Sequence, residues 1–383
     1  MLQEPLSTNC SLIVGGGFGG LTAALSLAER QPRSPVVLIE PRPQFLFQPH
    51  LYELLSDELQ GWEVAPAYSD LISNRGISWI QDRVVSINTS ARTVSTAAGH
   101  QLHWNQLLLA CGSSPNDFGI PGVRDHALGF QNLDDVHTLK CLIRDLRQRR
   151  LSHAALVIVG AGPTGVELAC KLADLLTGSA RLHLIEQGAT ILPNSPAFNR
   201  ERAVAALERR DVTVHLNTAV TGVTQNSVEL GSGSPLAHHG LIWTAGSRPN
   251  LPDMEPAPAM AKGRLAIDAA LRLVDQPSVF AIGDLSCCEN DPWPSTAQVA
   301  MQQGEAVARS IHQQQQQDEE PTPFRFEDRG EMLSLGIGDA TLTGMGITLA
   351  GPLAFGIRRA TYLTRLPGLS LGLRAAGAWL LGR

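Results

Sequence analysis

GGGFGG (residues 15–20) and GAGPTG (residues 160–165) are the two stretches of this 383-residue chain that indicate its fold class most clearly. Each follows a short apolar run typical of a buried strand and precedes a segment with helical spacing of apolar residues. A second apolar run then ends in an acid, Glu40 after the first motif and Glu186 after the second. Strand, GxGxxG turn, helix and acid-terminated strand together form the dinucleotide-binding βαβ pattern. The sequence therefore predicts an α/β protein with two Rossmann-like domains.

In both copies the same residue types serve the same purpose. The first glycine allows the tight turn, the second allows the backbone to approach the pyrophosphate, and the third allows the helix to pack on the sheet. The pyrophosphate lies at the helix N-terminus, and the glutamate accepts hydrogen bonds from the adenosine ribose. Gly-rich turns that bind nothing are the alternative, but two complete copies favour two dinucleotides between which electrons pass. The expected binding residues are Gly15, Gly17, Phe18, Gly19, Gly20 and Glu40 in the first copy, and Gly160, Gly162, Pro163, Thr164, Gly165 and Glu186 in the second.

Composition argues against several other classes of function. The formal net charge of −6 gives no support for nucleic-acid binding. The six cysteines show neither a CxxC pair nor zinc-ligand spacing, so we expect no metal site and a reducing compartment. No signal or transit peptide is recognisable before Ser11, and no run of about 18 apolar residues occurs. We expect a cytosolic protein, or one attached to a membrane from its cytosolic side.

Other apolar runs end in small or acidic residues, as strands do where ligands bind at their carboxyl ends. The first run ends at Ala110 and Gly112, the second at Ala245 and Gly246, and the third at Gly283 and Asp284. Their order indicates that one dinucleotide domain is inserted within the other. We expect a discontinuous first domain at residues 1–118 and 251–325, a second at 119–250, and a distinct C-terminal region at 326–383.

The C-terminal region has an unusual charge pattern. Residues 341–383 contain no Asp, Glu or Lys but five arginines, among them Arg358 and Arg359, and apolar residues recur at helical spacing. An amphipathic helix of this kind suits the interface of an anionic bilayer, with Tyr362 and Trp379 near headgroup level. The alternative is a helical hairpin that packs on the body of the protein or on a second subunit in a homodimer.

Together these motifs resemble the type II, non-proton-pumping NAD(P)H:quinone oxidoreductases, and the resemblance covers nearly the whole chain. It rests on the two fingerprints, the second extending as GAGPTGVELA to Ala169, on FLFQPHLY (residues 45–52) and on AQVAMQQG (residues 297–304). Residues 51–66 and 350–354 are similar to the cyanobacterial and plastid branch of the family. In that branch the quinone is a prenylated one such as demethylphylloquinone or plastoquinone. The resemblance also implies a cyanobacterial source and a peripheral position on the cytoplasmic face of a membrane.

The resemblance assigns FAD to the first fingerprint and NAD(P)H to the second. Glu186, with no arginine soon after it, favours NADH because it would repel a 2′-phosphate. The residues implied along the cofactors are Pro49, Val84, Ala110, Gly112, Gly283, Asp284 and Ala297 for FAD, and Ala245 and Gly246 for NAD(P)H.

The resemblance places the helix that carries Gln298, Gln302 and Gln303 beside the flavin, where quinone is reduced. Gln298 and Gln302 are one turn apart, and their amide N–H groups could stabilise negative charge on a quinone oxygen. The alternative is that the side chains of Gln302 and Gln303 face solvent. Glu167 is a candidate for steering charge or protons between the two sites. The alternative is that this glutamate is present because the helix dipole favours an acid in the first turn of a helix.

Two rival functions remain open at this point. Sulfide:quinone oxidoreductases share the fold but need cysteines that flank the flavin; Cys287 and Cys288 follow Asp284, and no second cysteine occupies the matching later position. A membrane-bound flavoprotein that senses the NADH/NAD ratio would use the same binding sites as the enzyme.

Overall fold

The computed structural model describes residues 10–31, 35–149, 153–317 and 320–365. The described chain forms two compact units. The first comprises Met1–Leu46, Ala65–Ser114 and Arg248–Glu327, and the second Phe47–Val64, Pro115–Ser247 and Asp328–Arg383. The short strands β8 (Ser113–Pro115) and β16 (Ser247–Pro249) lie where the chain passes from one unit to the other. The expected α/β fold is confirmed in both units.

The first unit is built on a six-stranded sheet in the order β20-β21-β7-β1-β2-β3. Its central strands are parallel, and β1 lies between β2, which follows it in sequence, and β7, which comes much later. Such a reversal of strand order is where open α/β sheets bind ligands, at the carboxyl ends of the strands. The strands are β1 (Ser11–Val14), β2 (Val36–Ile39), β3 (Ile77–Ile80), β7 (Gln106–Leu109), β20 (Arg272–Leu273) and β21 (Gln276–Ala281).

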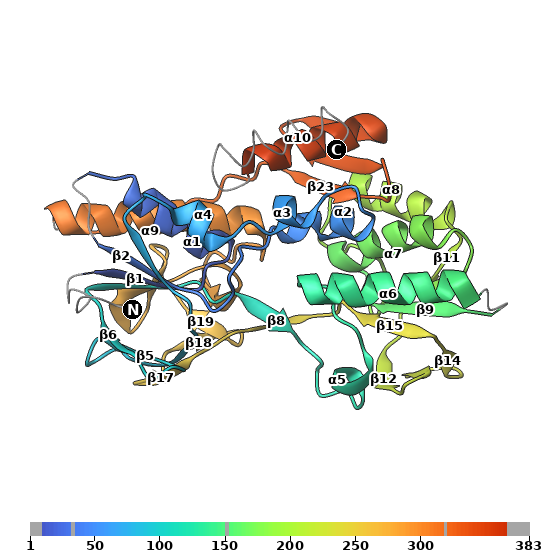
Figure 1. Ribbon diagram of the computed structural model, residues 1–383, viewed down its shortest axis with the longest axis horizontal. Coiled ribbons are helices and arrows are strands. Elements are labelled where there is room, and N and C mark those ends of the chain that lie inside the picture. The colour runs from blue at the N-terminus through green and yellow to red at the C-terminus, as the bar shows by residue number, and fades with distance from the viewer. Residues whose placement is uncertain (1–9, 32–34, 150–152, 318–319, 366–383) are drawn as a thin grey trace. The chain divides into compact units, whose positions relative to one another are not determined.

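Two helices cover one face of this sheet, α1 (Phe18–Ala28) and α9 (Ala297–Gln317) (Figure 1). They approach closely because glycines face each other: a Cβ at Gly304 would lie only 2.4 Å from the Gly19 carbonyl oxygen. The remaining elements of the unit are α4 (Tyr68–Ile72), the turn η2 (Gly283–Leu285), a sheet of β17 (Asp253–Glu255), β4 (Val84–Asn88), β5 (Thr93–Thr96) and β6 (Gln101–His103), and a sheet of β18 (Met260–Ala261), β19 (Arg264–Ala266) and β22 (Ser286–Cys287).

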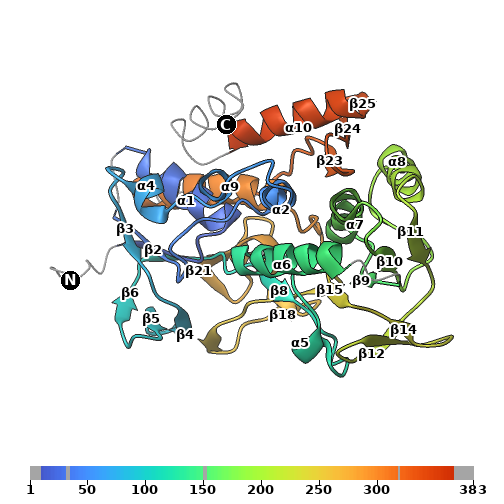
Figure 2. The same cartoon turned by 45° about the vertical axis from the view of Figure 1, so that its right-hand side comes forward.

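The second unit repeats this plan with a parallel sheet in the order β11-β10-β9-β15. Here β9 again lies between the next strand, β10, and a much later one, β15. Helices lie on one face of the sheet, and α5 with the β12–β14 sheet lies on the other (Figures 1 and 2). The elements are β9 (Ala155–Val159), β10 (Arg181–Ile185), β11 (Val212–His215), β15 (Gly240–Trp243), α5 (Val123–His126), α6 (Leu133–Arg149), α7 (Pro163–Leu176), α8 (Ala197–Glu208), β12 (Val220–Val223), β13 (Ser227–Leu230) and β14 (Leu236–Ala237).

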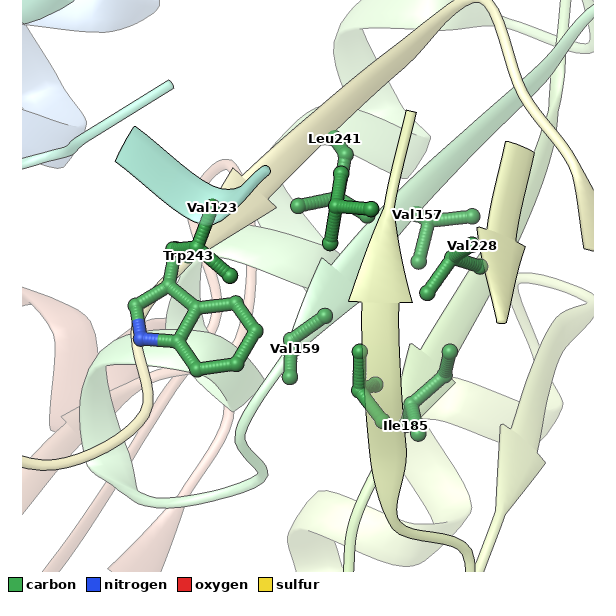
Figure 3. Close-up of a cluster of buried hydrophobic side chains, with 9 residues drawn as sticks. Val123, Val157, Val159, Ile185, Val228, Leu241 and Trp243 are labelled. Carbon is green, nitrogen blue, oxygen red and sulfur yellow. The ribbon is translucent and has the colours of Figure 1, made fainter. Parts of the chain in front are cut away.

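An apolar core joins the second sheet to the β12–β14 sheet. Alternate residues of the central strands, such as Val157 and Val159 on β9, project to the same face and meet Val228 of β13 (Figure 3). Trp243 closes the cluster beside Val123 of α5. Burial of these β-branched and aromatic side chains holds the strand ends that carry the second fingerprint.

The rest of the second unit joins the segment 47–64 to the described part of the C-terminal region. Helix α10 packs on β24 and β25, and α7 contacts β23 (Figure 2). The helix expected from the apolar spacing after residue 350 is confirmed as far as Arg365, and the expected tail beyond it lies outside the described residues. The elements are η1 (Gln48–His50), α2 (Leu51–Leu55), α3 (Gly61–Val64), β23 (Glu331–Ser334), β24 (Ala340–Gly344), β25 (Ile347–Ala350) and α10 (Pro352–Arg365).

Candidate functional site

The first fingerprint forms the turn between β1 and α1, and its positions differ in whether packing within the protein requires a glycine there. Gly15 has φ +97°, and a Cβ there would lie 2.5 Å from the Ala110 carbonyl oxygen. A Cβ at Gly20 would lie 1.9 Å from the Gly15 carbonyl oxygen. A Cβ at Gly17 would meet no described atom within 4 Å. The protein itself therefore requires Gly15 and Gly20, whereas Gly17 leaves room for a group that is not part of the chain.

Glu40 is fixed directly beneath this turn. The Glu40 residue is only 2% exposed. Its carboxylate accepts hydrogen bonds from the backbone N–H of Gly16 (2.7 Å) and from Nε of Arg42 (2.7 Å). Burial alone would raise the pKa of Glu40, but the Arg42 guanidinium and the Gly16 N–H outweigh it and hold the pKa below its usual value. The Tyr68 hydroxyl donates to the Gly16 carbonyl (2.7 Å). The structure thus brings Glu40 and the fingerprint together as a rigid assembly.

Asp284 lies in the turn η2, after β21, whose end is beside the carboxyl end of β7. The Ser113 hydroxyl donates a hydrogen bond of 2.7 Å to Asp284 Oδ2. The backbone N–H of Gly283 donates to Oε1 of Gln303 (2.7 Å), and the Gln303 side chain is buried. Gln303 therefore anchors the Gly283–Asp284 turn to α9 and does not face solvent. No sequence motif pointed to Ser113.

The other residues expected near the flavin are spread over the first unit. Ala110 lies against Gly15, and Gly112 follows it with φ +64°. Ala297 begins α9, and Phe18, which begins α1, packs edge-on against Phe45 with 5.4 Å between ring centroids. Val84 begins β4 in a separate small sheet. Its contribution to a cofactor site remains a prediction.

Gln298 and Gln302 are one turn apart on α9, as expected, and both are partly exposed. The Gln302 amide is already paired: its Nε2 donates to the Glu327 carbonyl (2.9 Å), and its Oε1 accepts from the Glu327 N–H (3.0 Å). A primary amide has two N–H donors, so one remains for another acceptor. The reciprocal pair fixes the direction of the side chain.

The second fingerprint reproduces the first almost residue by residue. Gly160 has φ +100°, and a Cβ there would lie 2.9 Å from the Ala245 backbone. A Cβ at Gly165 would lie 1.8 Å from the Gly160 carbonyl oxygen, whereas one at Gly162 would meet no described atom within 4 Å. As in the first turn, packing requires the outer glycines, and the middle one borders open space.

The strand ends around this turn carry the remaining predicted residues of the second site. Pro163 and Thr164 begin α7, where a proline is tolerated because its missing N–H has no helical partner. The Thr244 hydroxyl donates to the Val159 carbonyl (2.8 Å) and so ties β15 to the turn. Gly246 has φ +67°, and the exposed ring of Phe118 lies against it.

Glu186 is held differently from Glu40. Its Oε2 accepts from the N–H of Ala161 (2.8 Å), and its Oε1 accepts from the N–H of Gly188 (2.7 Å). The residue is only partly buried, and no ion pair to it occurs among the described residues. Two backbone donors fix the orientation of the carboxylate at the carboxyl end of β10.

Glu167 is buried in α7 beside a group that the sequence did not reveal. Its Oε1 accepts a hydrogen bond of 2.6 Å from the Ser334 N–H and lies 3.8 Å from the Arg358 guanidinium. Burial raises the pKa of Glu167 to about 7, although Arg358 and the Ser334 N–H act in the opposite direction. A carboxyl group with this pKa exchanges its proton near neutral pH.

Arg358 inserts from α10 into the interior of the second unit, where it pairs with Glu53 of α2. Its Nη2 also donates to the Pro49 carbonyl (3.0 Å). Burial would raise the pKa of Glu53, but the Arg358 guanidinium outweighs it and lowers the pKa. The paired charges explain why an arginine is tolerated in this position. Sequence reasoning missed Glu53 because a single glutamate in a short apolar helix resembles a surface residue. It missed the burial of Arg358 because the absence of acids in the tail favoured arginines on an exposed helix face.

The expectation that Tyr362 lies at headgroup level is wrong. Its ring is buried, 5.5 Å from Phe47 and 5.2 Å from His50 between centroids, and Arg358 lies over it at 4.7 Å. Ala354, Arg358 and Tyr362 thus form the buried face of α10. The apolar residue Leu353 is instead 65% exposed. The helix is amphipathic, but part of its apolar stripe points away from the unit.

Comparisons with known proteins agree with this geometry. Residues 11–304 match the family of pyridine nucleotide-disulphide oxidoreductases. The chain is 35% identical to demethylphylloquinone reductase NdbB of Synechocystis sp., with 96% of each chain covered. It is 32% identical to alternative NAD(P)H-ubiquinone oxidoreductase C1, chloroplastic/mitochondrial, of Arabidopsis thaliana, with 93% of this chain and 77% of the relative covered. The solved structure of NDH2 from Plasmodium falciparum in complex with NADH shares the fold, with a TM-score of 0.87, 18% identity and 96% of both chains covered.

Proposed function

The chain belongs to the pyridine nucleotide-disulphide oxidoreductase family and, within it, to the type II NAD(P)H:quinone oxidoreductases, and from this premise we propose that it is an FAD-dependent enzyme that oxidises NADH and reduces a membrane prenylquinone without pumping protons. A bound flavin supplies the group that accepts a hydride and returns two electrons. The residues of the chain bind and orient the reactants and stabilise the charge that develops on them.

One observation carries the proposal: the same open position occurs in both fingerprints. Among the fingerprint glycines, Gly17 and Gly162 are the two for which packing within the described chain gives no steric reason. Each borders the N-terminus of a helix, which favours a pyrophosphate. Each also lies near a glutamate, at the carboxyl end of the neighbouring strand, that suits a ribose diol. The residues present therefore fit two dinucleotides.

We assign FAD to the first unit and the nicotinamide dinucleotide to the second. Glu40 is buried and held by Arg42, which suits a cofactor that stays bound. Asp284 and its partner Ser113 provide polar groups for the ribityl chain at the end of β21. Glu186 is partly exposed and needs no cation, which suits a substrate that binds and leaves.

The fixed carboxylate of Glu186 supports a preference for NADH over NADPH. Both of its oxygens accept backbone hydrogen bonds, from Ala161 and Gly188, so turning away from a 2′-phosphate would break both. The negative charge therefore stays where an additional phosphate would lie. We propose that this selectivity comes mainly from repulsion.

We propose that Glu167 holds the proton needed during quinone reduction. Oε1 accepts from the Ser334 N–H and lies 3.8 Å from the Arg358 guanidinium, and the Tyr52 side chain also hydrogen-bonds to this carboxyl group. A pKa of about 7 allows both protonation states near neutral pH. In the first unit, the remaining amide hydrogen of Gln302 and the amide of Gln298 would orient the quinone and stabilise charge on its oxygen.

Demethylphylloquinone, the substrate that the name of the Synechocystis relative states, is our first choice of acceptor, with plastoquinone next. The quinone implies contact with a bilayer. In the part of the chain that the structure describes, none of the helices combines the length and the hydropathy of a membrane span. Met345 and Ile347 are exposed close to α10, and Leu353 is exposed on the helix itself. We propose that these residues and the tail attach the protein to the cytoplasmic face of a membrane.

The two rival functions differ from this proposal in chemistry that can be observed. Burial raises the pKa of the Cys111 thiol to about 12, so this cysteine remains protonated and is a poor nucleophile for sulfide chemistry. Cys287 and Cys288 are both free. A sensor of the NADH/NAD ratio would bind nicotinamide but show little turnover.

Steady-state kinetics with NADH and NADPH against a series of prenylquinones tests the proposal. We expect turnover that requires both a nicotinamide and a quinone, with a higher kcat/KM for NADH. Sulfide-dependent reduction of the bound flavin without nicotinamide would instead support the sulfide:quinone alternative. Flavin reduction by NADH without quinone turnover would support the sensor.

A further inference from the structure

A cationic pocket lies in the second unit, away from its fingerprint turn. It has a volume of about 600 Å³ and is lined by α8, by the turn before β24, and by β25 with the first residue of α10. Arg202 and Arg209 contribute its positive charge, and Asp339 contributes a negative charge. None of the proposed steps of NADH oxidation or quinone reduction uses this pocket.

Arg202 of α8 and Arg209, the C-cap of this helix with helical backbone angles, are seven residues or about two turns apart and so face the same side. The Arg202 guanidinium lies over the Phe198 ring at 5.3 Å and makes no hydrogen bond or ion pair with any described residue. Stacking on Phe198 fixes the side chain while its N–H donors stay available. Arg209 uses one nitrogen on Asp339 (3.0 Å), and its side chain is 57% exposed.

The start of α10 adds to the positive potential of the pocket. Pro352 lines it as the first helical residue, and the first turn of α10 contains no acid. The helix dipole therefore acts in the same direction as the arginines. With two cations against one carboxylate, the pocket favours a group with one negative charge, and the arginine forks suit a phosphate.

Apolar side chains next to the pocket indicate the source of that phosphate. Leu349 lines the pocket, and Leu353, one residue beyond Pro352, is 65% exposed. Ile347, two residues before Leu349, is 52% exposed, and Met345 at the β24–β25 turn is 86% exposed. A free phosphate would leave these apolar residues without a role, whereas a phospholipid places acyl chains beside its phosphate.

We propose that this pocket binds the phosphate headgroup of an anionic phospholipid, with Arg202 and Arg209 as its ligands and Leu353 and Ile347 in the adjoining acyl region. This inference rests on the membrane attachment in the proposed function. It adds a specific headgroup site to that attachment. The site discriminates among lipids, which a merely apolar contact surface does not.

Flotation of the full-length protein with vesicles tests the proposal. One set contains phosphatidylcholine alone and the other contains phosphatidylglycerol in addition. The test variant is Arg202→Gln with Arg209→Gln, and the matched control is Arg144→Gln with Arg147→Gln on α6, whose arginines are also exposed. Both variants lose two positive charges, so nonspecific attraction to the vesicles falls equally.

We expect the pocket variant to lose about 30-fold in affinity for the phosphatidylglycerol vesicles, equivalent to about 1 kcal/mol for each arginine. The control should lose much less, and affinity for phosphatidylcholine vesicles should not change in either. Equal losses in the two variants would overturn the proposal. Release of the wild-type protein from phosphatidylglycerol vesicles by millimolar inorganic phosphate at constant ionic strength would also overturn it, because the site would then bind free phosphate.

Turnover with NADH and a water-soluble quinone separates this inference from the proposed function. Both variants should keep wild-type turnover because neither pair of arginines belongs to the proposed catalytic or dinucleotide-binding residues. If the wild-type protein itself lacks turnover but shows the arginine-dependent lipid preference, the proposed function fails and the headgroup site stands.

Discussion

The two fingerprint regions share their backbone plan and differ in how each glutamate is held. Glu40 is buried, paired with Arg42 and connected through Gly16 to Tyr68. Glu186 is partly exposed and fixed only by backbone N–H groups. The same motif therefore holds a buried, ion-paired glutamate in one unit and a partly exposed glutamate in the other. On the proposed assignment, the surroundings of the motif, more than the motif itself, distinguish the unit for a resident cofactor from the unit for an exchanging substrate.

The largest effect is expected for Gly17→Val. Its side chain would extend into the space that the pyrophosphate needs, so FAD affinity should fall about 100-fold, or roughly 2.7 kcal/mol. Flavin absorbance per chain measures the loss. The FAD-stripped variant should melt near the temperature of the FAD-stripped wild type, because Gly17 has open space around it. A large loss of stability in the stripped variant would contradict this account of Gly17.

Gly162→Val makes the matching change in the second unit. We expect it to keep its FAD and to weaken NADH binding about 30-fold, or roughly 2 kcal/mol, since the same overlap now affects the exchanging ligand. Flavin content and an NADH titration together measure the two affinities. If Gly162→Val lost FAD, or Gly17→Val kept it, the assignment of the two units would be reversed or wrong.

Glu186→Ser removes the charge that would oppose a 2′-phosphate. The ratio of kcat/KM for NADH to that for NADPH should fall about 20-fold, close to 1.8 kcal/mol, the size of a charged hydrogen bond. Glu201→Ser, an exposed acid on α8, serves as the control for loss of one negative charge. An unchanged ratio in Glu186→Ser would show that another residue sets the preference.

The smallest effect concerns Glu167, the buried acid of the second unit. Its pKa of about 7 means that the carboxyl is protonated below pH 7 and ionised above it. If the neutral form donates the proton, kcat should fall about tenfold from pH 6 to pH 8. Glu167→Gln should abolish this inflection, whereas Glu208→Gln on the surface of α8 should keep it. A retained inflection in Glu167→Gln would assign the titration to another group.

Local sequence was enough to predict the features that depend on short-range geometry. Strand, turn, helix and acid fall within about 30 residues, so the placement of Glu40 and Glu186 beside their turns follows from the βαβ pattern. Contacts between distant segments could not be predicted in this way. Ser113 and Asp284 are 171 residues apart, and Glu53 and Arg358 are 305 apart.

The C-terminal helix shows why a charge pattern alone misleads. Helical spacing correctly predicted α10, but the absence of acids favoured arginines exposed on a polar face. The acid that pairs with Arg358 belongs to α2, and that pairing turns Tyr362 inward. A long-range buried ion pair thus reversed the expected orientation of one face, and only tertiary packing contains that information.

Anaerobic stopped-flow spectroscopy of the purified protein is the sharpest test of one resident flavin and one exchanging nicotinamide. After gel filtration the protein should retain about one FAD and no nicotinamide per chain; NADH should bleach the flavin, and a soluble quinone should then rapidly restore its absorbance. This outcome is expected from one resident and one exchanging dinucleotide. A protein that retains nicotinamide in place of flavin, or whose reduced flavin is not reoxidised by quinone, would contradict the account.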